Sequence, residues 1–91
     1  MLQKKPTSAV EQEQYVSFGD IARSRLGMQC QYASRYVDGA FPDEYPDLAS
    51  DPALGNPLRI YGDSGNYHSY MIHRDDVDAI VHRISQYRNA T

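Results

Sequence analysis

The sequence predicts a small α+β domain made of two short helices, a β-hairpin and a C-terminal helix. Apolar residues recur at helical spacing on both sides of Gly27, two short β-type runs flank the segment 63–66, and a longer helical repeat runs from Val77 to Tyr87. At 91 residues the chain allows one domain with a modest core. A multi-layer enzyme fold is therefore not expected.

The first fourteen residues are polar and show no apolar period, so we expect a flexible N-terminal arm over 1–14. Its Lys4 and Lys5 could follow phosphate groups, although a terminus without any role has the same composition. The remainder, 15–91, is expected to fold as one domain that begins with an extended segment at Tyr15 and Val16. Since no apolar run reaches the roughly 18 residues of a membrane span, and the single Cys30 cannot form an internal disulfide, we expect a cytoplasmic protein.

The first predicted helix begins at Ser17, and Asp20 three residues later forms a capping-box-like pair with it. Its apolar stripe consists of Phe18, Ile21, Ala22 and Leu26. Gly27 is suited to the left-handed cap that ends many helices, because a Cβ would be strained there. We therefore expect a sharp turn after this helix.

The second predicted helix runs from about residue 29 to 38 and ends at Gly39, with Pro42 beyond it. Ala33, Tyr36 and Val37 form its inner face. At about 100° per residue the opposite face is polar, with Gln, Arg and Ser side chains that can pair with adenine, guanine and either base edge. The outer face consists of Gln31, Ser34, Arg35 and Asp38, with Tyr32 and Cys30 at its flanks. Because the Asp38 carboxylate would repel phosphate, Gln31, Ser34 and Arg35 are the stronger candidates. An ordinary solvated helix face would have the same composition.

Two β-type runs at 58–62 and 67–72 predict a hairpin around the turn 63–66. The final helix is predicted from Val77, Ile80, Val81, Ile84 and Tyr87, with Asp75 or Asp76 as its cap and Arg83 and Arg88 near its end.

The net charge of −3 argues against a nucleic-acid partner until its distribution is considered. A loop predicted at 42–57 holds four of the five prolines and four acidic residues without Lys or Arg, and removing those four charges from −3 leaves +1. The weakly basic remainder predicts modest DNA affinity per protomer, raised by assembly on neighbouring sites. The acidic loop should point away from phosphate or contact a neighbouring protomer, and a plain solvated insertion is the alternative.

The run from Phe18 to Pro42, FGDIARSRLGMQCQYASRYVDGAFP, resembles the helix-turn-helix of the MerR-like, excisionase-type winged-helix proteins. In that family an Ile-Ala-x-x-Leu-Gly segment leads into a recognition helix that closes with Gly and an apolar-Pro pair. The matching residues are Ile21, Ala22, Leu26, Gly27, Gly39, Phe41 and Pro42. Two features depart from the pattern. Three residues instead of two separate Ala22 from Leu26, which should lengthen the helix or loosen its end, and Gln29 stands where Ser or Thr more often caps.

The order of helix-turn-helix, hairpin and Asp-Val-Asp-Ala helix extends the resemblance over roughly Ser17 to Arg88. It implies a winged helix-turn-helix with a two-stranded wing and a C-terminal packing helix. The implied function is that of a DNA-binding regulator of a phage or mobile element, acting as an excisionase, a transcriptional repressor or both, through cooperative binding to repeated sites. MerR activators continue into a coiled coil and a ligand domain, whereas this sequence ends at Thr91, which favours the excisionase branch.

The implied partners are double-stranded DNA, further copies of the chain on DNA, and an integrase. No cofactor, metal or membrane is expected. The candidate DNA-contacting residues come from both helices and from the hairpin: Arg23, Arg25, Gln31, Tyr32, Ser34, Arg35, Arg59, Ser64, Asn66 and His68.

Other functions remain open at this stage. A small terminase-type packaging subunit can use a similar winged helix, and the acidic loop at 42–57 could serve a protein-interaction module. A metal site built on Asp78 and His82 has no complete ligand set, and the eight tyrosines include no marked nucleophile. The sequence therefore predicts a binding protein in preference to an enzyme.

Overall fold

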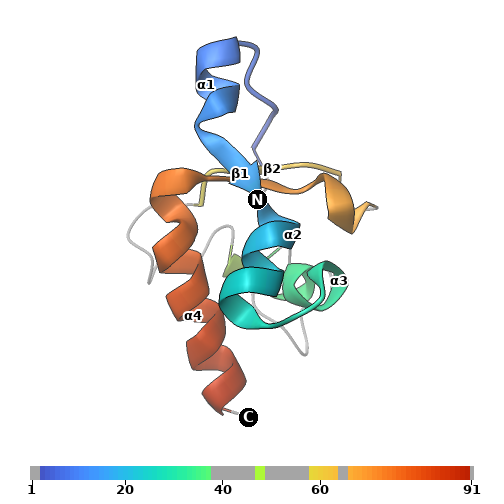
Figure 1. Ribbon diagram of the computed structural model, residues 1–91, viewed down its shortest axis with the longest axis vertical. Helices are drawn as coiled ribbons and strands as arrows, with labels where there is room; N and C mark the ends of the chain where they lie inside the picture. Colours follow the sequence, from blue (N-terminus) through green and yellow to red (C-terminus); the bar gives the residue numbers. More distant parts are fainter. Residues whose placement is uncertain (1–2, 38–46, 49–57, 64–65, 91) are drawn as a thin grey trace.

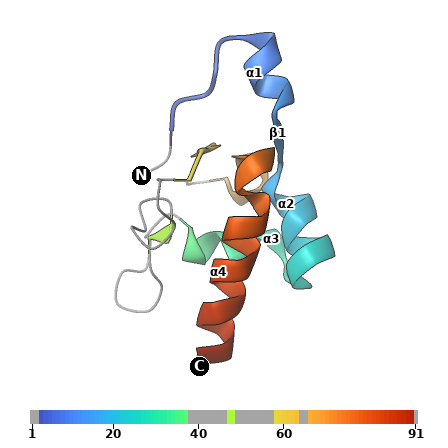
Figure 2. The ribbon, with the colours of Figure 1, turned by 90° about the vertical axis from the view of Figure 1, so that its left-hand side faces the viewer.

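The computed structural model describes residues 3–37, 47–48, 58–63 and 66–90. Helices pack with a three-stranded antiparallel sheet, which confirms the predicted α+β class (Figure 1). A short helix, α1 (Ala9–Glu13), projects from one end, and the C-terminal helix α4 (Val77–Ala90) runs toward the other (Figures 1 and 2). Across the described residues no helix is both long and apolar enough to cross a membrane.

The first predicted helix is α2 (Phe18–Ile21), which continues as a π-helical turn over Ala22–Leu26. Gly27, at φ 64°, donates its N–H to the carbonyl of Ala22, five residues back. Such a turn holds one residue more than an α-helical turn. The wider turn returns Leu26 to the core and leaves Arg25 exposed. The three residues between Ala22 and Leu26 are thus accommodated in a widened helical turn.

The predicted capping pair of this helix is wrong. Ser17 makes no side-chain cap hydrogen bond, and the Asp20 carboxylate instead accepts a hydrogen bond from Arg23. The helix N-terminus is held through the backbone, because the N–H of Phe18 donates to the carbonyl of Tyr70 at 3.0 Å. The residue just before β3 therefore supplies a partner at the helix N-terminus, where the capping box was expected to act.

The second predicted helix is α3 (Cys30–Ala33) followed by a 3-10 turn at Ser34–Tyr36. Its buried stripe consists of Cys30, Ala33, Ser34 and Val37, the spacing of one helix face. The predicted inner positions Ala33 and Val37 are confirmed. The predicted end at Gly39 and Pro42 lies outside the described residues.

The sheet has the strand order β1-β3-β2, with β1 (Tyr15–Ser17), β2 (Ile60–Tyr61) and β3 (Met71–His73). β2 and β3 form the predicted hairpin, with Ile60 opposite Ile72. The extended segment at Tyr15 is confirmed and becomes a third strand, because Val16 pairs with Ile72 on the other side of β3. The second β-type run was predicted too long, since Tyr67–Ser69 forms a 3-10 turn.

Gly62 directly follows β2 and has φ at 148°, a conformation that L residues rarely adopt. A Cβ there would lie 2.6 Å from Tyr70 Cδ1 and 2.9 Å from the carbonyl oxygen of Ser69. We expect Gly62→Ala to lower the free energy of unfolding by about 2 kcal/mol or more. Gly27→Ala is the matched control, because nothing lies within 4 Å of its added Cβ, and it should cost only about 1 kcal/mol of backbone strain. Urea unfolding of both variants tests this, and equal losses would contradict it.

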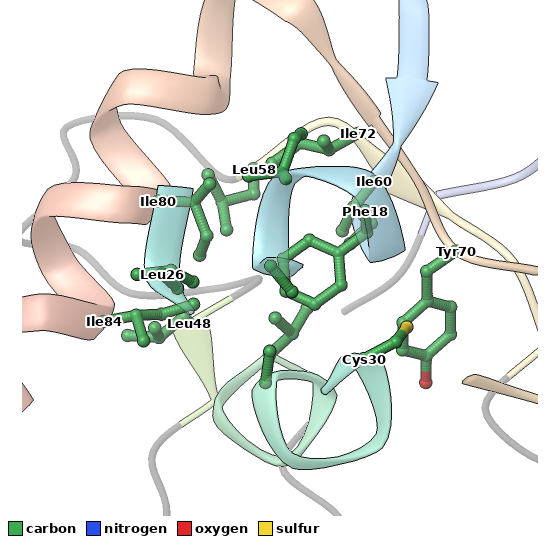
Figure 3. Packing of buried hydrophobic residues seen from close by; sticks show 14 residues of the cluster. Phe18, Leu26, Cys30, Leu48, Leu58, Ile60, Tyr70, Ile72, Ile80 and Ile84 are labelled. Atoms are coloured by element: carbon green, nitrogen blue, oxygen red, sulfur yellow. The ribbon is translucent and has the colours of Figure 1, made fainter. Parts of the chain in front are cut away.

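The hydrophobic core is formed by residues of the helices and of the sheet. Ile80 and Ile84 of α4 lie beside Leu26 and Leu48, while Phe18 lies between them and Tyr70 (Figure 3). Val77, Val81 and Tyr87 pack against this cluster, which confirms the predicted apolar face of α4. At the far end of α4, Arg88 Nη1 donates to the carbonyl of Leu26 at 2.7 Å. The last helix therefore holds the end of the π-helical turn in place.

Two predicted loop regions differ from expectation where they are described. The arm over 1–14 contains α1, with Ser8 as its cap, so the prediction of no regular structure is wrong for Ala9–Glu13. Within the predicted loop 42–57 the described residues are Asp47, which is exposed, and Leu48, which is fully buried in the core. The other acidic residues of that loop lie outside the described residues.

Candidate nucleic-acid interface

Three elements meet on one side of the domain: the first helix, α3 and the turn of the hairpin. α2 and the 3-10 turn Tyr67–Ser69 both pack against α3. Between them lies a hollow of ≈ 180 Å³, lined by Arg23, Gln29, Cys30, Gln31 and His68. The structure therefore brings together Arg23, Gln31 and His68, which are predicted site residues from three separate segments.

The polar groups of this hollow face solvent. The Arg23 side chain is 62% exposed, although its guanidinium donates to Asp20. Gln31 is exposed, and its Nε2 donates to Gln29 Oε1 at 3.2 Å. Because this bond joins two flexible exposed side chains, a stronger partner can replace it at small cost. A bound ligand could therefore form hydrogen bonds with both the N–H and the carbonyl group of the Gln31 amide.

Cys30 forms the floor of the hollow and is buried. Burial raises the pKa of its thiol, and this effect outweighs the opposing influence of the nearby Arg23 charge. The thiol is therefore protonated at neutral pH and is a poor nucleophile. Its place in the stripe of α3 fits a packing role.

Tyr32 and Arg35 extend the exposed surface along α3. The Tyr32 side chain is accessible, and the Arg35 guanidinium carbon lies 5.2 Å from the centre of its ring. A cation held over an aromatic face in this way is restrained in direction while remaining partly exposed. These two predicted residues stand next to the hollow without lining it.

The prediction that Ser34 lies on the exposed outer face of the second helix is wrong. It is fully buried, and its Oγ donates to the carbonyl of Gln31 at 3.0 Å. A serine hydroxyl can satisfy itself on the preceding turn and then behave as a small core residue. The sequence signal was present, because positions 30, 33, 34 and 37 form one helical stripe once Cys30 is counted as apolar.

Arg59 pairs with an acidic residue that the sequence did not indicate as its partner. It precedes β2 and lies away from the hairpin turn, where its Nε and Nη2 donate to the Asp76 carboxylate at 3.0 and 2.9 Å. The backbone N–H of Arg59 donates to the same carboxylate at 2.9 Å. A second hollow, ≈ 220 Å³ in volume, contains Arg59 together with His73 and Gln14. Arg59 thus links the sheet to the start of α4.

The remaining candidates divide three ways. Arg25 pairs with Asp78 of α4 at 2.9 Å and does not line the hollow of Arg23. Asn66 accepts the N–H of His68 at 3.2 Å and so caps the turn that carries this histidine. Ser64 lies outside the described residues. Gln29 was predicted only as an unusual cap, but it lines the hollow. Helical spacing could not indicate this position, because Gln29 precedes the first residue of α3.

No metal-binding group of three or more His, Cys, Asp or Glu side chains occurs among the residues that the structure describes. Comparison with family models, curated proteins and solved structures finds no match.

Proposed function

We propose that this domain is a sequence-specific, double-stranded DNA-binding regulator of the winged helix-turn-helix type. The observation that carries the proposal is the convergence of Arg23, Gln31 and His68 from three elements on one hollow. α3 and the 3-10 turn Tyr67–Ser69 pack together and both contribute residues to this face. α3 would enter the major groove, and the hairpin turn would reach the neighbouring backbone or minor groove.

The side chains on this face match base and phosphate chemistry. A glutamine amide both donates and accepts, so Gln31 can bind an adenine edge through two hydrogen bonds. Arg23 and Arg35 can bind guanine or phosphate oxygens, and His68 can donate to phosphate. Asn66 supports His68 by fixing its turn. Contacts to bases would supply specificity, while those to phosphate would set the position of the domain.

The cationic groups on this face are few, so one protomer should bind weakly. We propose that adjacent copies bind repeated sites cooperatively and that the domain serves a phage or mobile element as an excisionase, as a transcriptional repressor, or as both. An integrase is the partner that an excisionase role would require. In this proposal the domain binds DNA and carries out no reaction itself.

Selection of bound fragments from the source genome, followed by footprinting, tests the proposal. We expect enrichment of fragments that hold a repeated sequence, with protection that spreads from one repeat to the next as protein is added. Random recovery of fragments, or protection of one isolated site at every concentration, would contradict it.

A further inference from the structure

The N-terminal segment meets the outer edge of β2 through Gln3, and we refer to Gln3–Lys5 as the strap. The N–H of Gln3 donates to the carbonyl of Ile60 at 2.8 Å, and Gln3 bridges to Tyr61 in parallel orientation. Lys4 and Lys5, which follow directly, are both exposed. The hydrogen bond to Ile60 therefore anchors the backbone at Gln3, while the side chains of Lys4 and Lys5 remain in solvent.

These lysines stand over a hollow next to the hairpin turn. It measures ≈ 480 Å³ and is lined by Gln3, Lys4, Lys5, Tyr61, Gly62, Asp63 and Ser69. His68, the residue before Ser69, lines the other hollow with Arg23 and Gln31. The neighbouring residues His68 and Ser69 thus line two hollows, one with Arg23 and Gln31 and the other with the only two lysines of the chain.

We propose that the strap is a second DNA-backbone contact, in which Lys4 and Lys5 bind phosphate on the far side of the hairpin turn. This inference rests on the proposed function and extends the footprint beyond the helix pair. DNA that meets α3 and the turn would continue past the turn toward the strap. Lysine binds phosphate as a flexible point charge, which suits a contact that positions the domain without reading sequence.

Asp63 lines the same hollow as Lys4 and Lys5, and its negative charge would weaken their attraction for phosphate. Its backbone holds the turn, because its N–H donates to Ser69 Oγ at 2.8 Å and its carbonyl accepts from Asn66. Asp63→Asn keeps those backbone groups and removes the negative charge. If phosphate lies in this hollow, the substitution should tighten DNA binding severalfold. Glu13→Gln in α1 removes the same charge outside the hollow and should change affinity less than twofold.

The main test measures the affinity of the full chain for the selected DNA across a range of salt concentrations. Replacing both lysines with glutamine should weaken binding about tenfold and lower the slope of log affinity against log salt by about 1 to 2, since each phosphate contact contributes about 0.9. The control Arg74→Gln with Arg83→Gln removes two positive charges near α4 and should leave the slope unchanged. An equal effect of the two pairs, or no effect of the lysine pair, would overturn the inference.

Gln3→Pro tests the attachment separately, because proline removes the N–H that donates to Ile60 while both lysines remain. We expect a loss of several-fold in affinity at unchanged net charge, and unchanged affinity would overturn the strap's positioning role. If the unsubstituted chain binds no DNA, the proposed function fails along with the strap. If the unsubstituted chain binds DNA and replacing both lysines leaves its affinity unchanged, only the inference about the strap is wrong.

Discussion

Replacing Arg23 and Gln31 together with alanine is expected to reduce affinity for the selected DNA by about 100-fold or more. Both side chains line the hollow between the first helix, α3 and the hairpin turn. Each good two-bond base contact is worth about 1 to 3 kcal/mol, so loss of two groups should remove most of the discrimination between selected and random DNA. Electrophoretic shift or fluorescence titration on both DNAs measures the change.

The matched control for this variant is Ser34→Ala. Ser34 belongs to the same helix, but its hydroxyl is buried and bonded to the Gln31 carbonyl. Its loss should leave DNA affinity within about twofold and lower the free energy of unfolding by only about 1 kcal/mol. A Ser34→Ala variant that lost as much affinity as the double variant would show that folding, and not the exposed face, governs binding.

Replacing Asp76 with asparagine should lower the free energy of unfolding at pH 7 by about 2 to 3 kcal/mol. Its carboxylate is 18% exposed and accepts three hydrogen bonds from Arg59, through the backbone N–H, Nε and Nη2. Hydrogen bonds to a charged group are stronger than neutral ones, and removing that charge leaves the guanidinium with a weaker partner. Urea unfolding curves of both proteins give the difference.

At acidic pH the Asp76–Arg59 contact should no longer contribute to the free energy of unfolding. Burial alone would raise the pKa of the Asp76 carboxyl, but the hydrogen bonds and charge of Arg59 outweigh it and hold the pKa below the ordinary 3.8. A carboxyl with a depressed pKa stabilises the folded state above its ordinary pKa, and the stabilisation is lost as pH falls through the depressed value. The gap between the unsubstituted chain and Asp76→Asn should therefore narrow below about pH 4.

Asp75→Asn is the control for Asp76→Asn. Its side chain is 66% exposed and lies 3.7 Å from the His73 ring, so it should contribute less than about 1 kcal/mol. Equal losses for the two aspartates would contradict the assignment of the stabilisation to the Arg59 contact.

Periodic apolar patterns in the sequence were sufficient to predict the larger elements. The stripe of Ile80 and Ile84 predicted α4, and the β-type runs predicted the hairpin, because both patterns record burial directly. The third strand was indicated by Tyr15 and Val16, but its partner was not. Pairing β1 with the far edge of β3 depends on tertiary contacts that local spacing does not record.

The site was less predictable than the fold, because it depends on which partner each polar side chain finds. Arg59 was expected to contact DNA from the first run of the hairpin, but its guanidinium pairs with Asp76, 17 residues later in the sequence. Ser34 was placed on the outer face from the helical angle, but it lies on the buried stripe of α3 and its hydroxyl donates to the preceding turn. Gln31 was assigned from helical angle, and its exposure agrees with that assignment.

Photo-crosslinking from α3 shows which face of the domain meets DNA. A photoreactive phenylalanine analogue at Tyr32, which is 45% exposed and adjacent to Gln31, should crosslink to bases inside the footprint of the selected DNA. The same group at His82, on the exposed face of α4, should not. Crosslinks from position 82 and none from position 32 would show that DNA binds a different face of the domain, and the proposed recognition by α3 would then be wrong.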